Sequence, residues 1–201
     1  MRHANQPIRF SALEKKDLFK AWILTSIAFT VFFLQGQLSK VSTTGFLVIF
    51  VLAGATAGVG FIVHELCHKF AAHHFHVHGE FRANTMMLYM SIVFALMGFI
   101  IAAPGAVYMT GHITKRQNGI ISAAGPASNI VLAALFLPLF LMEGLPKTIG
   151  YFGLLINAIL AGFNMIPFGN FDGSKVLPWS KPVYFTMVFL AGILIVLAYS
   201  L

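Results

Sequence analysis

The stretch FIVHELCHKF, residues 61–70, places three side chains that can do chemistry within about one turn of a helix. His64 and His68 are four residues apart, so on a helix they share one face and both imidazoles can reach one metal ion, for which zinc is the usual occupant. Glu65 lies beside the first histidine, where its carboxylate can reach a water at the metal. In this H-E-x-x-H pattern the glutamate acts as a general base. The spacing therefore predicts a hydrolytic zinc site.

These ionisable residues follow an almost wholly apolar stretch, residues 45–63, and share one expected helix with it. An acidic or basic residue at the centre of such a helix costs roughly 2.5–3.5 kcal/mol on insertion scales. Chance occurrence of the pattern in this setting is therefore disfavoured, which strengthens the metal-site interpretation. The competing interpretation is structural, with polar side chains that hydrogen-bond to one another inside a helix bundle.

A third metal ligand is expected elsewhere in the chain, because a catalytic zinc usually has three protein ligands and one open position. Asp172 is the first candidate among the six acidic residues, because it follows an apolar helix and precedes Gly173. Glu80, in the polar connection after the motif, is the second candidate. A histidine is a further alternative, and His112 is the only one outside the N-terminal tail and the cluster around the motif. The other acidic residues lie in the polar N-terminal tail or in a short loop: Glu14, Asp17 and Glu143.

The composition is that of an integral membrane protein. Of the 201 residues, 58% are hydrophobic and only 9% are charged, against about 25% charged residues in a soluble domain. The net charge of +7 comes from Lys and Arg spread between apolar segments, which fits loops that orient a membrane protein better than a nucleic-acid surface. Cys67 is the single cysteine, so no internal disulfide can form. It lies about 100° round the helix from His68, and we expect a small packing residue there, not a ligand.

The apolar segments predict an all-α integral membrane protein, a bundle of about five to six transmembrane helices with a short membrane re-entrant β-like element. We expect a basic juxtamembrane segment, residues 1–20, and one membrane-embedded domain, residues 21–201, with a catalytic core at about 45–175. The first apolar run is interpreted as a retained signal anchor, in a multi-pass protein of the cell membrane that has the lipid bilayer around it. The expected apolar segments are residues 21–38, 45–72, 86–103, 120–142, 149–166 and 183–201.

Two further patterns each have a functional and a structural interpretation. Gly54 and Gly58 form a small-xxx-small pair, which suits either a groove for a substrate helix or, as we expect, close packing between helices. The stretch HHFHVH, His73 to His78, could form a second metal site because alternate histidines align on a strand. We expect instead a solvated connection that binds metal only adventitiously.

The topology follows from the proposed ligands. The histidines and Asp172 each lie near the C-terminal end of a helix, so the two helices must run in the same direction for the ligands to meet. One of the two apolar segments between them must then enter and leave by the same face, and APGAVYMTG marks residues 86–112 as that re-entrant element. This arrangement places all but Lys40 and Lys147 of the 13 Lys and Arg residues on one side. The positive-inside rule then directs the N-terminus and the site toward the cytoplasm.

Three stretches together resemble the site-2 protease family of intramembrane zinc metalloproteases, in the order found in that family. HELCH at 64–68 matches the zinc-binding and catalytic motif. AGPASN at 124–129 resembles the Gly-Pro motif of the following core helix, and NMIPFGNFDG at 164–173 resembles the N-x-x-P…D-G motif. The chain departs from the commoner pattern at Cys67, where the family often has glycine, and we expect it to lack the PDZ or CBS modules that some members carry.

The resemblance implies that His64, His68 and Asp172 bind one zinc ion per chain and that Glu65 is the general base. It also implies cleavage of peptide bonds in or near the transmembrane helix of a membrane-protein substrate, beside a β-element that presents an edge strand. Asn129 falls where the family often has an asparagine near the active site. It either donates to the oxyanion or makes a helix-packing hydrogen bond.

The sequence-based hypothesis is therefore an intramembrane zinc endopeptidase with no nucleic-acid partner and an oligomeric state that the sequence leaves open. Two other functions remain as alternatives. A zinc transporter would need ligands along a path, whereas the polar residues here converge at one end of the motif helix. An inactive homologue that only binds membrane helices would be expected to lack a motif residue, and none is missing.

Overall fold

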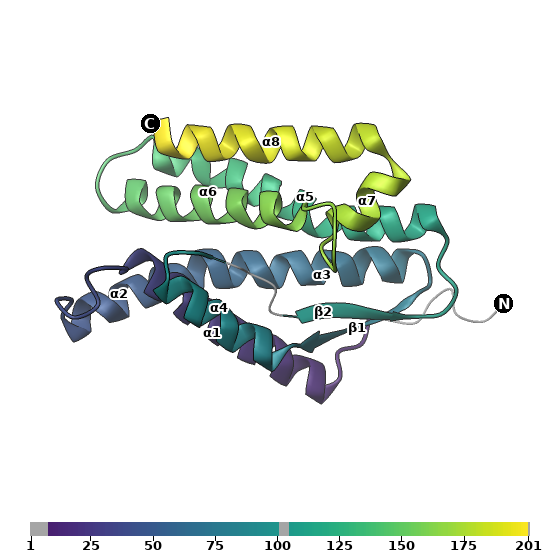
Figure 1. The fold of residues 1–201 in the computed structure, drawn as a ribbon, viewed down its shortest axis with the longest axis horizontal. Helices are drawn as coiled ribbons and strands as arrows, with labels where there is room; N and C mark the ends of the chain where they lie inside the picture. The colour runs from purple at the N-terminus through teal and green to yellow at the C-terminus, as the bar shows by residue number, and fades with distance from the viewer. Residues whose placement is uncertain (1–7, 101–104, 201) are drawn as a thin grey trace.

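The computed structural model describes residues 8–100 and 105–200. Two residues used in the topology prediction lie outside the described residues. They are Arg2, one of the 13 Lys and Arg residues, and Pro104, in the stretch APGAVYMTG. The described chain is mostly helical, with one short antiparallel hairpin (Figure 1). Its elements in chain order are α1 (Ala12–Phe33), α2 (Thr43–Ala53), the π-helical turn η1 (Gly54–Gly58), α3 (Val59–His74), β1 (His78–Ala83), α4 (Thr85–Leu96), β2 (Gly105–Thr110), α5 (Lys115–Phe140), α6 (Leu145–Asn164), α7 (Gly173–Trp179) and α8 (Lys181–Ser200).

Four helices in the described residues are long and apolar enough to cross a membrane: Thr43–His74, Lys115–Phe140, Leu145–Asn164 and Lys181–Ser200. α4 has 12 residues and so rises about 18 Å, short of the roughly 30 Å hydrocarbon core of a bilayer. α1 is longer, but its first turns carry charged side chains. A membrane protein is therefore supported, whereas the expected count of five to six spans is not confirmed.

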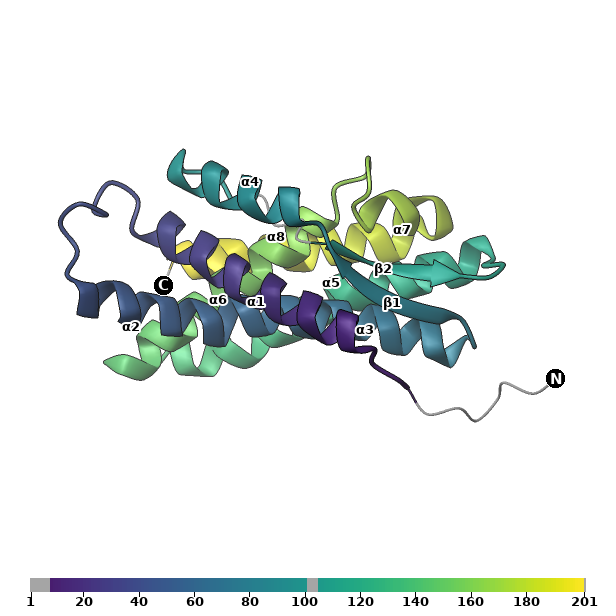
Figure 2. The ribbon, with the colours of Figure 1, turned by 90° about the horizontal axis from the view of Figure 1, so that it is seen from below.

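The helices form two groups on either side of the central helix α3 (Figure 1). α5, α6 and α8 pack together on one side, whereas α1, α4 and the β1–β2 hairpin lie on the other. The view from below shows α1 crossing α3 beside α4 (Figure 2). Leu154, Ile156 and Ala158 on α6 are each 2% exposed or less, and they belong to the apolar clusters that join α6 to its neighbours. α3 itself contacts α5 on one side and β1, β2 and α1 on the other, so it lies between the two groups.

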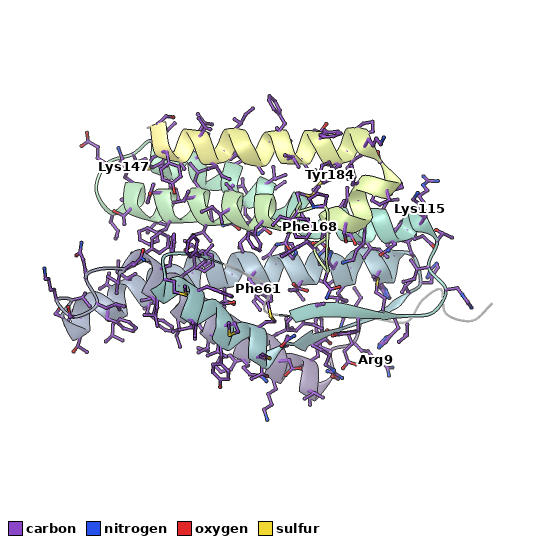
Figure 3. The ribbon with its side chains drawn as sticks, in the orientation of Figure 1. Arg9, Phe61, Lys115, Lys147, Phe168 and Tyr184 are labelled. Atoms are coloured by element: carbon purple, nitrogen blue, oxygen red, sulfur yellow. The ribbon has the colours of Figure 1, made fainter. Side chains whose placement is uncertain are left out.

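α3 and α6 run in the same direction, as the convergence of the proposed ligands requires (Figure 1). The chain between α3 and α5 leaves and returns at the same end of the bundle, although residues 101–104 are not described. Lys115 and Lys147 lie at opposite ends of the bundle (Figure 3), as expected for two residues near either end of the long helix α5. The orientation of these ends in the membrane stays a prediction.

The hairpin contains a strand that the sequence did not predict. Residues 73–84 were interpreted as a polar connection, but β1 pairs with β2 in an antiparallel register that sets Glu80 opposite Tyr108. The outer edge of β1 is satisfied by α1: Phe81 N–H donates to Glu14 Oε1 at 3.0 Å, and Ala83 N–H donates to Asp17 Oδ2 at 3.3 Å. A two-stranded hairpin alone is marginally stable, so this tertiary contact explains a strand that local propensity does not.

Glu14 therefore does not lie in a solvated tail, as its sequence position suggested. It is 1% exposed, and its Oε2 accepts a hydrogen bond from Lys69 Nζ at 2.5 Å. Lys69 also donates to the carbonyl of Arg9 at 2.8 Å. Because Lys69 directly follows a motif histidine, this buried ion pair joins α1 and β1 to the motif end of α3.

The small-residue pair in η1 serves helix packing. Trp22 Nε1 of α1 donates to the carbonyl of Gly54 at 3.0 Å. A Cβ on Gly58 would come within 2.7 Å of the Ser26 hydroxyl and closer still to the Trp22 ring. The expected close packing of helices is confirmed, and α1 occupies the space that a substrate helix would need.

Candidate metal centre

Three ligand atoms converge between α3 and the start of α7. His68 Nε2 lies 3.0 Å from His64 Nε2 and 3.1 Å from Asp172 Oδ2, and His64 Nε2 lies 3.3 Å from the same carboxylate oxygen. All three residues are buried. Within residues 8–100 and 105–200 they are the one group of three or more His, Cys, Asp or Glu residues whose ligand atoms converge on a point.

The local fold brings Asp172 back to the histidines. Asp172 ends the connection after α6 and directly precedes α7. At Gly173 the backbone passes so close to the end of α6 that a Cβ would clash with the Met165 carbonyl group and come within 2.7 Å of the Ile166 carbonyl oxygen. The glycine of the Asp-Gly pair therefore permits the close turn that places the carboxylate over α3.

The donor set fits zinc. Zn–N and Zn–O bonds of about 2.0–2.1 Å in a tetrahedral site place neighbouring ligand atoms about 3.3 Å apart, close to the 3.0–3.3 Å observed between these atoms. Gly125 of α5 faces the same point, where a Cβ would lie 2.6 Å from His64 Nε2 and would also clash with His68 Nε2. This glycine thus leaves room beside the two nitrogens that would bind a metal.

The second nitrogen of each imidazole is held by α5. His68 Nδ1 donates to the Ile121 carbonyl at 2.7 Å, and His64 Nδ1 donates to Asn129 Oδ1 at 2.6 Å. Such outer hydrogen bonds select the tautomer that leaves Nε2 free for a metal and set the orientation of the ring. The helix that follows the hairpin therefore orients both histidines.

Asn129 is fully buried, and both the oxygen and the nitrogen of its side-chain amide are hydrogen-bonded. Its oxygen accepts from His64, while Nδ2 donates to the Gly60 carbonyl at 3.1 Å and to Asn157 Oδ1 at 3.0 Å. Asn157 in turn donates to the Gly153 carbonyl of its own helix at 2.8 Å. An amide has two N–H donors, so this one has none left for a substrate. The geometry favours the hydrogen-bonding interpretation of Asn129 over oxyanion donation.

Glu65 is 6% exposed, and its Oε2 has no hydrogen-bond partner within the described chain. It lines two adjoining cavities, of about 510 Å³ and about 80 Å³. The smaller cavity is also lined by His64, His68 and Asp172. A buried carboxylate oxygen without a partner is costly. Its position beside the ligand atoms suits a group that takes a proton from water.

The other candidate ligands from the sequence are not brought to this point. Glu80 lies on β1, where it accepts a hydrogen bond from Ser11 and pairs with Arg82 at 3.0 Å. The Ser11 hydrogen bond, and after it the Arg82 charge, holds the pKa of the Glu80 carboxyl below its usual value. Glu143 and His112 are exposed. Neither Cys67 nor the histidines at 73–78 join a three-ligand group in the described chain.

A known protein is similar to this chain over most of its length. A protein of Methanocaldococcus jannaschii that is provisionally named a zinc metalloprotease is 41% identical over 143 residues, which cover 69% of this chain and 75% of that protein. This chain belongs to the same family of zinc metalloproteases.

A second family member comes from Mycolicibacterium smegmatis and is also provisionally named a zinc metalloprotease. It is 30% identical over 148 residues, which cover 64% of this chain and 57% of that protein. No family profile matches the chain, and no solved structure matches it. Membership therefore rests on the first relative, and the zinc in both names agrees with the donor set of His64, His68 and Asp172.

Sequence reasoning missed three residues around the candidate metal centre. Gly125 was noted only as part of a motif. The absence of a side chain there leaves space beside the two histidines, and this depends on how α5 packs on α3. Asn157 carried a usable signal, because an isolated amide inside an apolar helix needs a buried partner. Lys175 lines both cavities, but in the sequence it is one of 13 basic residues and nothing distinguishes it from a loop cation.

Proposed function

We propose that this metalloprotease is an intramembrane endopeptidase of the site-2 protease type, which cuts membrane proteins in or near their transmembrane helices. One observation carries the proposal: the buried His64, Glu65 and His68 lie on the helix Thr43–His74, which is long and apolar enough to cross a membrane. A soluble, polar peptide would have to leave water to reach residues on such an apolar helix, whereas a transmembrane segment is already in the bilayer. The N-terminus and the site are proposed to face the cytoplasm, as the distribution of basic residues favours.

Bound zinc would polarise the scissile carbonyl and make water a better nucleophile at neutral pH. Glu65 takes a proton from the attacking water and passes it to the leaving amine, so that one carboxylate serves as base and then as acid. His64 and His68 stay in the correct tautomer because Asn129 and the Ile121 carbonyl hold their Nδ1 protons. The small cavity admits only a few water molecules near these groups.

The substrate is proposed to bind as an extended strand along β2. A peptide bond in a helix is shielded by its own hydrogen bonds, so the cleavage segment must unwind. β1 cannot accept it, because Glu14 and Asp17 already occupy the N–H groups of its outer edge. β2 pairs only with β1 in the described chain, and three of its residues line the larger cavity together with Glu65: Gly105, Ala106 and Tyr108. Strand addition at this edge places a backbone carbonyl near the metal ligands.

The test is a cleavage assay on single-span substrates in liposomes. The purified protein is expected to cut at least one of a panel of such substrates at a defined bond. Chelator treatment is expected to abolish cutting, and one equivalent of zinc per chain is expected to restore it. Substrates in which the span is replaced by a soluble sequence should not be cut. Zinc flux into sealed vesicles without any cleavage would support a transporter instead and would contradict the proposal.

The hydrogen bonds of Asn129 lead to a separate prediction. Asn129→Ala leaves the His64 ring without its Nδ1 partner, and we expect zinc affinity or activity to fall by about 10–100-fold, as is typical for residues that orient metal ligands. Asn129→Asp keeps an acceptor for Nδ1–H but sets a carboxylate oxygen against the Gly60 carbonyl and Asn157 Oδ1, so we expect it to lower thermal stability as well. Zinc titration monitored by competition with a chromophoric chelator measures the zinc affinity of both variants. Equal zinc affinity in the wild type and Asn129→Ala would contradict this positioning role.

A further inference from the structure

The proposed hydrolysis needs a donor for the carbonyl oxygen, which gains negative charge as water attacks. Preorganised donors at this point are among the largest contributions to such reactions. Asn129 is not available, since its two N–H groups are bonded to Gly60 and Asn157. Zinc would polarise this carbonyl from one side, and any protein donor beside it would come from another residue that lines the cavities around the metal ligands.

The small cavity, of about 80 Å³, joins the metal ligands to a single cation. Its lining includes His64, Glu65, Asp172 and Lys175. A volume of this size holds only about two to three waters, and Lys175 lines it together with the metal ligands. Lys175 also lines the larger cavity, where it is again the one cation. The same side chain thus borders both the expected path of the substrate and the metal-binding point.

Lys175 is held in place but not neutralised. Its Nζ donates to the Asn170 carbonyl at 2.8 Å, and it forms no ion pair with a carboxylate in the described part of the chain. An ammonium has three donors, so two remain after this bond. By contrast, Lys69 on the other side of α3 is paired with Glu14. Lys175 therefore presents an unpaired, half-buried charge to the cavity.

We propose that Lys175 is a catalytic residue that donates a hydrogen bond to the oxygen of the scissile carbonyl as that oxygen becomes negative. This inference rests on the peptidase function proposed above. Lys175 keeps its proton throughout: water adds to the carbonyl carbon, Glu65 carries the proton, and the C–N bond breaks with the amine leaving protonated. The ammonium acts from the side of the cavity formed by the start of α7, opposite the carboxylate on α3. Because Lys175 is half-buried, such a charge interaction is stronger than between fully solvated groups.

The placement also explains the use of lysine at this position. The neutral donors that line the small cavity are Ser122, Asn164 and Asn170, and one of the two N–H donors of the Asn164 amide is bonded to the Leu160 carbonyl at 2.9 Å. A neutral hydrogen bond stabilises a developing negative charge less than a charge-assisted one. α7 begins directly after Asp172, so the same turn that positions the third metal ligand also positions the ammonium one helical turn later.

The test separates binding from chemistry in the liposome assay. Lys175→Met removes the charge at similar length, and we expect kcat to fall by about 100-fold, the usual loss for one such donor, with KM changed by less than about threefold. Lys175→Arg keeps a cation and is expected to retain more of kcat. Zinc content should equal that of the wild type in both. Lys181→Met, at the exposed start of α8 and outside both cavity linings, is the matched control and should behave as the wild type.

Chemical rescue tests the charge itself. In a Cys67→Ser background, Lys175→Cys offers a single thiol, which 2-bromoethylamine converts to a side chain of nearly lysine length with an ammonium, and iodoacetamide converts to a neutral amide. We expect kcat to recover only with the amine reagent.

Other outcomes overturn the inference. A rise in KM with unchanged kcat would assign Lys175 to substrate binding only, and loss of zinc would assign it to the fold of the site. A 100-fold loss in Asn164→Ala with none in Lys175→Met would make the amide the donor. If the wild type cleaves and Lys175→Met keeps its full kcat, the inference alone fails. If the wild type cleaves no substrate, the proposed function fails and this inference with it.

Discussion

Replacing Glu65 with Gln is expected to lower the cleavage rate by about three orders of magnitude, within the 10²–10⁴ range for loss of a general base, while the protein keeps its zinc. The glutamine has nearly the shape of the glutamate, so the α3–α5 packing should be unchanged. Its neutral amide cannot take a proton from water. Glu65 contributes no ligand atom to the converging group, so the metal affinity should be close to that of the wild type.

Three measurements on the same preparation decide this prediction: zinc content by atomic absorption, cleavage rate in liposomes, and thermal stability. Glu143→Gln, in the exposed loop between α5 and α6, is the matched control and should leave all three unchanged. The thermal midpoint of Glu65→Gln should be equal to or above that of the wild type, because the substitution replaces a buried carboxylate with a neutral group. Full zinc content together with full activity in Glu65→Gln would contradict the assignment of Glu65 as the general base.

Asp172→Asn is expected to release zinc and with it nearly all activity. The binding free energy of structural zinc sites, roughly 10–16 kcal/mol, divided over four ligands gives about 3 kcal/mol for one of them, which corresponds to about a hundredfold in affinity. The amide also carries no negative charge to offset the metal. Both histidines lie within 3.3 Å of the carboxylate oxygen, so its loss affects the whole ligand set.

The comparison variant for this prediction is Glu80→Gln, because Glu80 was the second candidate for the same ligand. It lies on β1 beside Arg82, and its substitution should leave the zinc content unchanged. A zinc titration of wild type, Asp172→Asn and Glu80→Gln orders the three affinities. If Glu80→Gln loses zinc while Asp172→Asn keeps it, the third ligand has been assigned to the wrong residue.

Local patterns predicted the motif helix and the pairing of His64 with His68. Both depend on the helical repeat, which brings residues four positions apart onto one face. The apolar runs predicted α5, α6 and α8 to within a few residues, because long apolar stretches leave helix as the favourable structure in lipid. The β character of residues 105–110 was also predicted. The α1 helix begins earlier than its apolar run, since its charged first turns make contacts with β1 that no local pattern indicates.

By itself, the sequence determined the chemistry at one helix: two histidines and a glutamate at a spacing that suits a hydrolytic metal site, in a chain too apolar to be soluble. It ranked Asp172 ahead of Glu80 as the third ligand, a choice that the resemblance to the site-2 protease family also implied, and it left two roles open for Asn129. Only the tertiary structure shows which of these side chains meet, because they come from segments that are far apart in the sequence. The close turn at Gly173 brings Asp172 to within 3.3 Å of both histidines, whereas Glu80 is held on β1 by Ser11 and Arg82. Because α5 packs on α3, the Asn129 oxygen accepts from His64 and its two N–H groups are bonded to Gly60 and Asn157. None of its N–H groups is free to donate to an oxyanion.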